Sequence, residues 1–167
     1  MKEEGGIRTA LVALLVVISG ACGSAPAQHQ DSGGPLLPEQ AEYDVAFYDL
    51  EVRVRPDARR LDGRLTLHAE ATAPLDTLVL DLDRRLAVDR VRVGAEVAAQ
   101  EVAFERRAHG NQLWIELPRA YEAGERIVAE VVYGGAPREA PDPPWDGGFT
   151  WAEAPDGAPW IATSCQT

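Results

Sequence analysis

The chain has 167 residues and a formal net charge of −11, and 46% of its residues are hydrophobic. This length suits one domain of ordinary size, and so large a hydrophobic share excludes a chain that is mostly disordered. The negative charge argues against a nucleic-acid partner, because phosphate contacts need a basic surface. Two cysteines, Cys22 and Cys165, are too few for a disulfide-based scaffold.

Residues 1–21 have the layout of an export signal. Positive charges precede an apolar run at residues 10–18, which is shorter than the roughly 20 residues that span a bilayer. Small residues then lead to Cys22, and this arrangement resembles a bacterial lipobox, whose cysteine is modified by lipid. We therefore expect a lipoprotein-type signal peptide, a lipid anchor on Cys22, and export to the cell membrane, periplasm or cell surface. Ordinary secretion with cleavage near residues 25–27 and an uncleaved anchor are the alternatives.

Residues 22–40 are small, polar and rich in proline and glycine, which predicts a flexible linker between anchor and domain. Farther along, Tyr48, Leu50, Val52 and Val54 alternate with charged residues and predict a half-buried strand. A second alternating run covers residues 61–72, after a polar turn. The two runs predict an antiparallel hairpin.

Further short alternating runs fall at residues 78–83, 91–93, 102–104, 113–117 and 127–133. Turn residues separate them, and Pro118 is expected to end the fourth run. No segment keeps a helical period for long. Residues 41–140 are therefore predicted to form an all-β domain, either an antiparallel β-sandwich or a saddle-like, strongly curved sheet.

The sequence shows no motif for catalysis or for metal binding. His29, His68 and His109 lie far apart, and neither H-E-x-x-H nor G-x-S-x-G occurs. Arginines cluster around the turn at residues 53–62 together with aspartates, which predicts surface ion pairs worth less than about 1 kcal/mol each. No catalytic residue and no metal ligand is predicted.

Residues 141–167 differ from the rest because they hold three of the four tryptophans, Trp145, Trp151 and Trp160. The turn-forming pairs Asp146-Gly147 and Asp156-Gly157 lie between them. Two interpretations are open. The tryptophans pack a loop or a β-ribbon onto the domain, or they form an aromatic surface that meets another domain or lines a substrate cleft.

Five segments carry a resemblance to a known family. They are YDVAFYDLEVRV, LDGRLTL, LVLDL, AGERIVAEVVYGGAP, and GGFTW followed by PWIATSCQ. In this order they resemble the N-terminal domain of the aminopeptidase N family of zinc metallopeptidases, over roughly residues 41–167. The resemblance implies a saddle-like N-terminal β domain that precedes a thermolysin-like catalytic domain.

The resemblance also implies what the chain lacks. The family holds zinc with H-E-x-x-H and a distal glutamate, recognises the substrate amine with G-x-M-E-N, and carries both beyond the region matched here. The chain is thus expected to bind no cofactor itself, to be inactive alone, and to cap the cleft of a zinc-containing catalytic domain. Gln166 falls where the family carries a glutamine or glutamate near the free amino terminus of the peptide substrate. The rival hypotheses are a noncatalytic β-sandwich binding lipoprotein of the cell surface and a noncatalytic family member.

Overall fold

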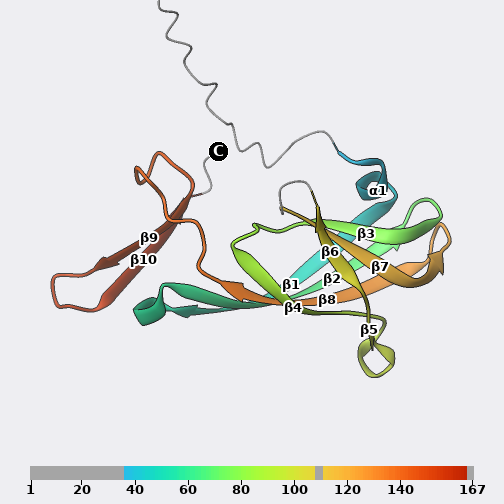
Figure 1. Cartoon of the computed structure of the whole chain (residues 1–167), viewed down its shortest axis with the longest axis horizontal. Coiled ribbons are helices and arrows are strands. Elements are labelled where there is room, and N and C mark those ends of the chain that lie inside the picture. Colours follow the sequence, from blue (N-terminus) through green and yellow to red (C-terminus); the bar gives the residue numbers. More distant parts are fainter. Residues whose placement is uncertain (1–35, 108–110, 165–167) are drawn as a thin grey trace, which may run out of the picture.

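The computed structural model describes residues 36–107 and 111–164, and these form antiparallel sheets with almost no helix. A five-stranded sheet has the order β1-β2-β8-β4-β5, a three-stranded sheet has the order β3-β7-β6, and β9 and β10 form a separate two-stranded ribbon (Figure 1). Every strand pair is antiparallel, which confirms the predicted class at this level. The strands are β1 Tyr43–Arg55, β2 Arg60–Ala71, β3 Leu75–Asp81, β4 Leu86–Val93, β5 Gln100–Glu101, β6 Phe104–Arg107, β7 Gln112–Tyr121, β8 Arg126–Gly135, β9 Gly148–Glu153 and β10 Pro159–Ser164.

Helical structure in the described residues is limited to single turns. The α-helix α1 covers Pro38–Ala41, at the end of the segment predicted as a linker, and the 3-10 turns η1 and η2 cover Pro56–Ala58 and Glu96–Ala98. None of these helices is long and apolar enough to cross a membrane.

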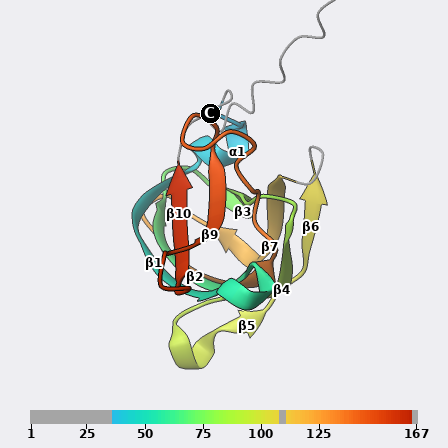
Figure 2. The same ribbon diagram turned by 90° about the vertical axis from the view of Figure 1, so that its left-hand side faces the viewer.

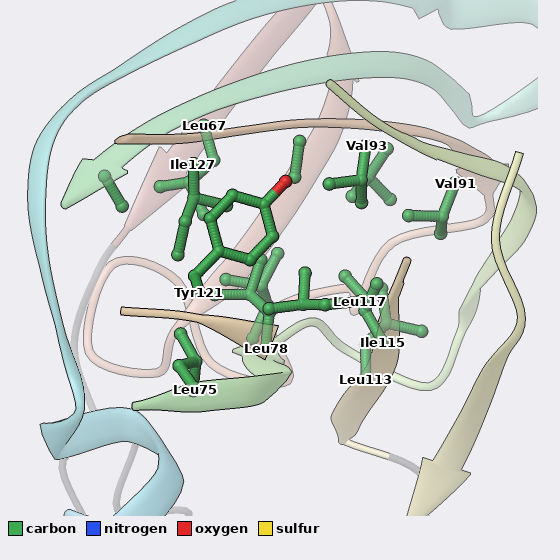
Figure 3. Close-up of a cluster of buried hydrophobic side chains, with 14 of the residues drawn as sticks. Leu67, Leu75, Leu78, Val91, Val93, Leu113, Ile115, Leu117, Tyr121 and Ile127 are labelled. Carbon is green, nitrogen blue, oxygen red and sulfur yellow. The ribbon is translucent and has the colours of Figure 1, made fainter. Parts of the chain in front are cut away.

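The hydrophobic core lies between the five-stranded and three-stranded sheets (Figure 3). Alternate residues of β2, β8 and β4 point toward alternate residues of β3 and β7, as the period of two predicts. The largest side chains with less than 2% exposure are Leu67, Leu75, Leu78, Leu113, Ile115, Ile127, Val79, Val91, Val93 and Val131. All of these residues except Val79 belong to one cluster of packed side chains, so the sheets bury one continuous apolar layer.

The predicted hairpin is confirmed by β1 and β2. Their register runs from Tyr43 opposite Ala71 to Arg55 opposite Arg60, with one shift between Val45 and Phe47. The turn is η1, closed by a hydrogen bond from the Arg59 N–H to the Pro56 carbonyl at 3.0 Å.

The glycine of the LDGRLTL segment has a packing role. Gly63 lies opposite Tyr133 on β8, and a side chain at Gly63 would overlap the phenol ring of Tyr133, with its Oη 2.6 Å away. Tyr133 is itself buried, so the ring has little room to move. Only glycine fits beneath this ring.

Pro118 does not end its strand, contrary to the prediction. β7 continues to Tyr121, because the pairing of β3 with β7 shifts between Leu75 and Thr77 and leaves residues 117–120 of β7 as an irregular bulge. Pro118 lies in this bulge, where a missing N–H costs no ladder hydrogen bond. The strand can therefore resume beyond the proline.

The prediction that β1 is half-buried is also wrong. Tyr43 does pack inward, and its hydroxyl donates a hydrogen bond of 2.6 Å to the Val79 carbonyl on β3. Burial, and then the nearby Tyr48 and Asp81, raise the pKa of the Tyr43 phenol. From Ala46 to Arg55, however, every residue of β1 is exposed. The alternation of β1 is real, but nothing in the described residues covers its apolar face.

Candidate functional site

The ribbon β9–β10 projects from the two-sheet body (Figures 1 and 2). Its base is fixed where Glu139 and Phe149 form a parallel bridge, with the Phe149 N–H donating to the Arg138 carbonyl at 2.8 Å. Gly148 is required at this point, since its φ is +137° and a Cβ there would lie 2.7 Å from the Ala140 nitrogen. The tail is therefore a built β-hairpin with a fixed root.

The far end of the ribbon is a tight turn at Ala154–Ala158. The Gly157 N–H donates to the Ala154 carbonyl at 2.8 Å, and the Ala158 N–H donates to Asp156 Oδ1 at 3.1 Å. Gly157 has a φ of +82°, as the predicted turn requires. This turn sets the register that places Trp151 opposite Ile161 and Trp160 opposite Ala152.

The register separates the tryptophans onto two faces of the ribbon. Phe149 and Trp151 share one face, and their rings stack with centroids 5.5 Å apart. Trp160 lies on the other face and is 52% exposed, while Trp145, in the loop before β9, is 71% exposed. Both faces thus present aromatic surface. The interpretation that all three tryptophans pack the ribbon onto the domain does not describe this arrangement.

A groove of about 480 Å³ separates the Trp151 face from the tip of the β1–β2 hairpin. Trp151, Pro159 and Ile161 line one wall, and Pro56, Asp57 and Arg59 line the other. The Trp151 Nε1–H is buried without a hydrogen-bond acceptor among the described residues. The atom is buried, so Trp151 contributes its ring rather than its N–H to the groove wall.

The rim of the groove is charged. Arg59 ends η1 in the left-handed conformation, with φ 49°, and its guanidinium lies 3.4 Å from a carboxylate oxygen of Glu139. The predicted ion pairs near this turn are present as well, with Arg55 Nε 2.5 Å from Asp62 Oδ2 and both side chains about half exposed. These contacts orient the hairpin tip, and as exposed pairs they add little stability.

The fourth tryptophan differs from the three in the tail. Trp114 lies on β7 beneath the guanidinium of Arg107, 4.0 Å from the ring centroid, and its Nε1–H donates to Gln112 at 3.3 Å. Its polar atom and its ring face are therefore both partnered. The two tryptophans classed as exposed, Trp145 and Trp160, both lie in the tail, whereas Trp114 is half-buried.

The residues predicted as sites lie outside the described part of the chain. Gln166, Cys165 and Cys22 are not described, nor are His29 and His109. His68 is described, and it stacks on Phe47 with ring centroids 4.1 Å apart. Within residues 36–107 and 111–164, no group of three or more His, Cys, Asp or Glu side chains is arranged to hold a metal ion.

Sequence reasoning missed one half of the groove. The sequence pattern predicts only a turn with surface charges at Pro56, Asp57 and Arg59, yet these residues line the groove together with Trp151. The sequence does contain one signal for the groove, namely two turns rich in Pro and Asp that each lie next to the apolar end of a strand. It does not reveal that residues so far apart in sequence meet.

Comparisons with known proteins connect this fold to one class. The chain is similar to the M1 zinc metallopeptidase of Deinococcus radiodurans in a mutant form bound to a Tyr-Ser-Ala substrate, with 29% identity and a TM-score of 0.52. A two-domain M1 zinc metallopeptidase mutant bound to L-arginine gives 28% identity and the same TM-score. The M1 zinc metallopeptidase from Deinococcus radiodurans without a stated mutation gives 26% and 0.50.

These matches cover 70–71% of this chain but only 27–28% of the solved chains. No family model and no curated protein matches the sequence. The matches to solved structures confirm the resemblance seen in the sequence. The described domain is similar to the non-catalytic N-terminal portion of M1 zinc metallopeptidases.

Proposed function

We propose that the chain is the non-catalytic β domain of an exported zinc metallo-aminopeptidase. It caps the cleft of a catalytic domain and helps that domain recognise the free amino terminus of a peptide. The observation that carries the proposal is the structural similarity to M1 metallopeptidases, over a region that spans about a quarter of their length. Zinc chemistry, in which the metal polarises the scissile carbonyl and activates water, would belong entirely to the catalytic domain.

The aromatic ribbon supports a domain contact. Trp145 and Trp160 are exposed, and aromatic side chains of this size are the usual anchors of protein interfaces. The groove beside Trp151 adds an apolar wall formed by Trp151, Pro159 and Ile161. We assign this surface, formed by residues 144–164 and the η1 turn, to the catalytic domain. By the family resemblance, Gln166 follows directly and would accept a hydrogen bond from the substrate ammonium group.

The gene beyond codon 167 tests the proposal first. We expect a continuous reading frame that encodes G-x-M-E-N and H-E-x-x-H. The encoded catalytic domain, expressed as a separate chain, should then bind this chain and gain activity toward aminoacyl-coumarin substrates. A stop codon with no such sequence downstream contradicts the proposal and favours the alternative, a noncatalytic binding lipoprotein of the cell surface.

Substitutions in the ribbon locate the contact. Trp160→Ser is expected to weaken binding of the catalytic domain by about tenfold or more, because a large exposed aromatic is lost from the interface. Val97→Ser is the matched control, since Val97 is 99% exposed and lies on η2, outside this surface. Equal affinities of the two variants, measured by calorimetry, would remove the ribbon from the interface.

Export and lipid anchoring form a separate part of the proposal. Its support is the sequence of residues 1–22, with an apolar run and small residues before Cys22. Cells grown with labelled palmitate should incorporate label into the wild-type chain and not into the Cys22→Ala variant. Label retained by that variant would mean that Cys22 is not the anchor, without bearing on the catalytic-domain contact.

A further inference from the structure

The strand β1 is a long, open sheet edge. It pairs with β2 on one side, and among the described residues no strand pairs with its other side. The segment 48–55 contains no proline, glycine or bulge, and its one protecting device is a charged residue at every second position. Tyr48, Leu50, Val52 and Val54 are 55, 56, 44 and 38% exposed. This edge can therefore accept another strand.

The charges of this segment are complementary to themselves. Asp49 and Glu51 come first, and Arg53 and Arg55 follow, so two negative and two positive charges sum to zero. The rest of the chain is strongly acidic and would keep two copies apart. The edge carries none of that repulsion.

We propose that two copies of this chain associate by antiparallel pairing of β1 with β1, with Val52 on the two-fold axis. In this register, residue i faces residue 104 − i of the second copy. Glu51 then faces Arg53, and Asp49 faces Arg55, so that all four charged pairs are opposite in sign. On the other face of the strand, Leu50 lies opposite Val54, and Val52 lies opposite itself. Cross-strand apolar and opposite-charge pairs of this kind stabilise sheets.

The register also continues a charge pattern already present within one copy. On the outer face of the five-stranded sheet, Arg90 on β4 lies 3.7 Å from Glu130 on β8. Glu130 lies 3.7 Å from Arg64 on β2, and Arg64 lies 3.8 Å from Glu51 on β1. The sign alternates at every strand and stops at Glu51 with an open edge. Arg53 of the second copy supplies the next positive charge in the row.

The bulge in β1 fits the same register. The shift between Val45 and Phe47 bends the strand before Tyr48, and η1 ends it after Arg55. The straight part between these points is centred near Val52. An isologous contact needs such a patch that pairs with itself, and a two-fold pair of strands closes after two copies. The partner is therefore a second copy rather than an open filament.

Variants in which two of the four charges on β1 are reversed in sign, here called half-swapped, test the pairing. The full chain is expected to be a dimer by sedimentation in mild detergent, which keeps the N-terminal apolar segment dispersed. Arg53→Glu with Arg55→Glu makes the edge entirely acidic, and Asp49→Arg with Glu51→Arg makes it entirely basic. Each double variant alone should be monomeric at the concentration at which the wild type is dimeric, with its dissociation constant raised at least tenfold. An equimolar mixture should form a heterodimer, because every facing pair is again opposite in sign.

The mixture also guards against misfolding, since only folded chains can recover the dimer. The variant with all four substitutions is self-complementary again and should dimerise alone. A monomeric wild type at 100 µM (about a hundred times a micromolar dissociation constant), or half-swapped variants that dimerise as the wild type does, would overturn the proposal.

A cross-link fixes the register. In a chain with Cys22→Ser and Cys165→Ser, the further substitution Val52→Cys should give an intermolecular disulfide, because directly opposed strand residues have Cα atoms about 4.5–5.5 Å apart. Tyr48→Cys is the matched control on the same strand and face. Its two copies would lie eight residues apart along the pair, on the order of 25 Å. Cross-linking at Tyr48 with none at Val52 would overturn this register.

Discussion

β1 and β8 flank the same strand, β2, and both alternate apolar and polar residues, yet their surroundings differ completely. In β8, every second residue is buried from Ile127 to Gly135. In β1, no residue from Ala46 to Arg55 is buried. Both strands present their apolar side chains to the same side of the sheet, since Leu50 faces Leu65 and Leu65 faces Val131.

The difference arises from the second sheet. The strands β3 and β7 pack over β8, β4 and β2, and they reach β1 only near Tyr43, whose hydroxyl contacts Val79. Beyond that point β1 overhangs the core. Alternation in a sequence therefore tells which residues share a face and leaves open whether anything covers that face. Where the cover is missing, here along β1 and along the ribbon, a partner is expected.

Truncation of an apolar side chain should give the largest difference in the free energy of unfolding between the covered and the uncovered regions. Ile115→Ala removes a side chain with 0% exposure on the sheet that covers β8. It should lower the free energy of unfolding by about 2–5 kcal/mol, because the cavity cannot fully collapse. Leu50→Ala, at 56% exposure, is the matched control and should change it by no more than about 0.5 kcal/mol in the dilute monomer. Urea unfolding followed by tryptophan fluorescence measures both. A similar loss in both variants would mean that β1 is covered after all.

A smaller effect tests the close packing of β2 against β8. Gly63→Ala would place a methyl group inside the space of the Tyr133 ring, at a cost of about 1–3 kcal/mol. Tyr133→Leu removes the phenol that causes the clash. The double variant should therefore lose less stability than the sum of the two single variants. Strict additivity would show that the ring is not what excludes a side chain at Gly63.

Much of the fold follows from local pattern. The alternating runs around Val52 and Leu65 predict the β1–β2 hairpin, because a short polar turn between two strands leaves few other pairings. The buried faces of β2 and β8 follow from the same period. The prediction at Pro118 fails because a bulge absorbs the proline, and a bulge depends on the partner strand. The prediction that β1 is half-buried fails for a similar reason, because the burial of this strand depends on where the opposite sheet stops.

The candidate site was predictable only in part. The cluster of Trp145, Trp151 and Trp160 marks the segment, and the turn glycines mark the ribbon's ends. The groove forms because Arg59 and Trp151, which are distant in sequence, line the same space. Such an arrangement of distant segments leaves no periodic pattern in a single sequence. Gln166 and Cys22 stay predictions, because they lie outside the described residues.

The turn before β8 and the turn at the end of β1 give the prediction with the smallest expected effect. Before β8, Glu125 accepts hydrogen bonds of 2.8 Å from both terminal nitrogens of Arg119 and one from the Glu122 N–H. The guanidinium of Arg119, and then the Glu122 N–H, lower the pKa of Glu125 from 4.5 to about 2. At the end of β1, by contrast, Arg59 lies 3.4 Å and 3.5 Å from the oxygens of Glu139.

Because the folded-state pKa of Glu125 is below its unfolded value, its contribution is complete above about pH 5 and is lost as the pH falls toward 2. Glu125→Gln should therefore lower the melting temperature at pH 7, and its difference from the wild type should shrink on acidification and become small near pH 2. Glu139→Gln is the control and should cause a smaller loss at pH 7, since its contacts are longer and exposed. Melting curves between pH 2 and pH 7 measure this. A difference between wild type and Glu125→Gln that stays constant over that range would show that the Glu125 carboxylate does not stabilise the turn before β8.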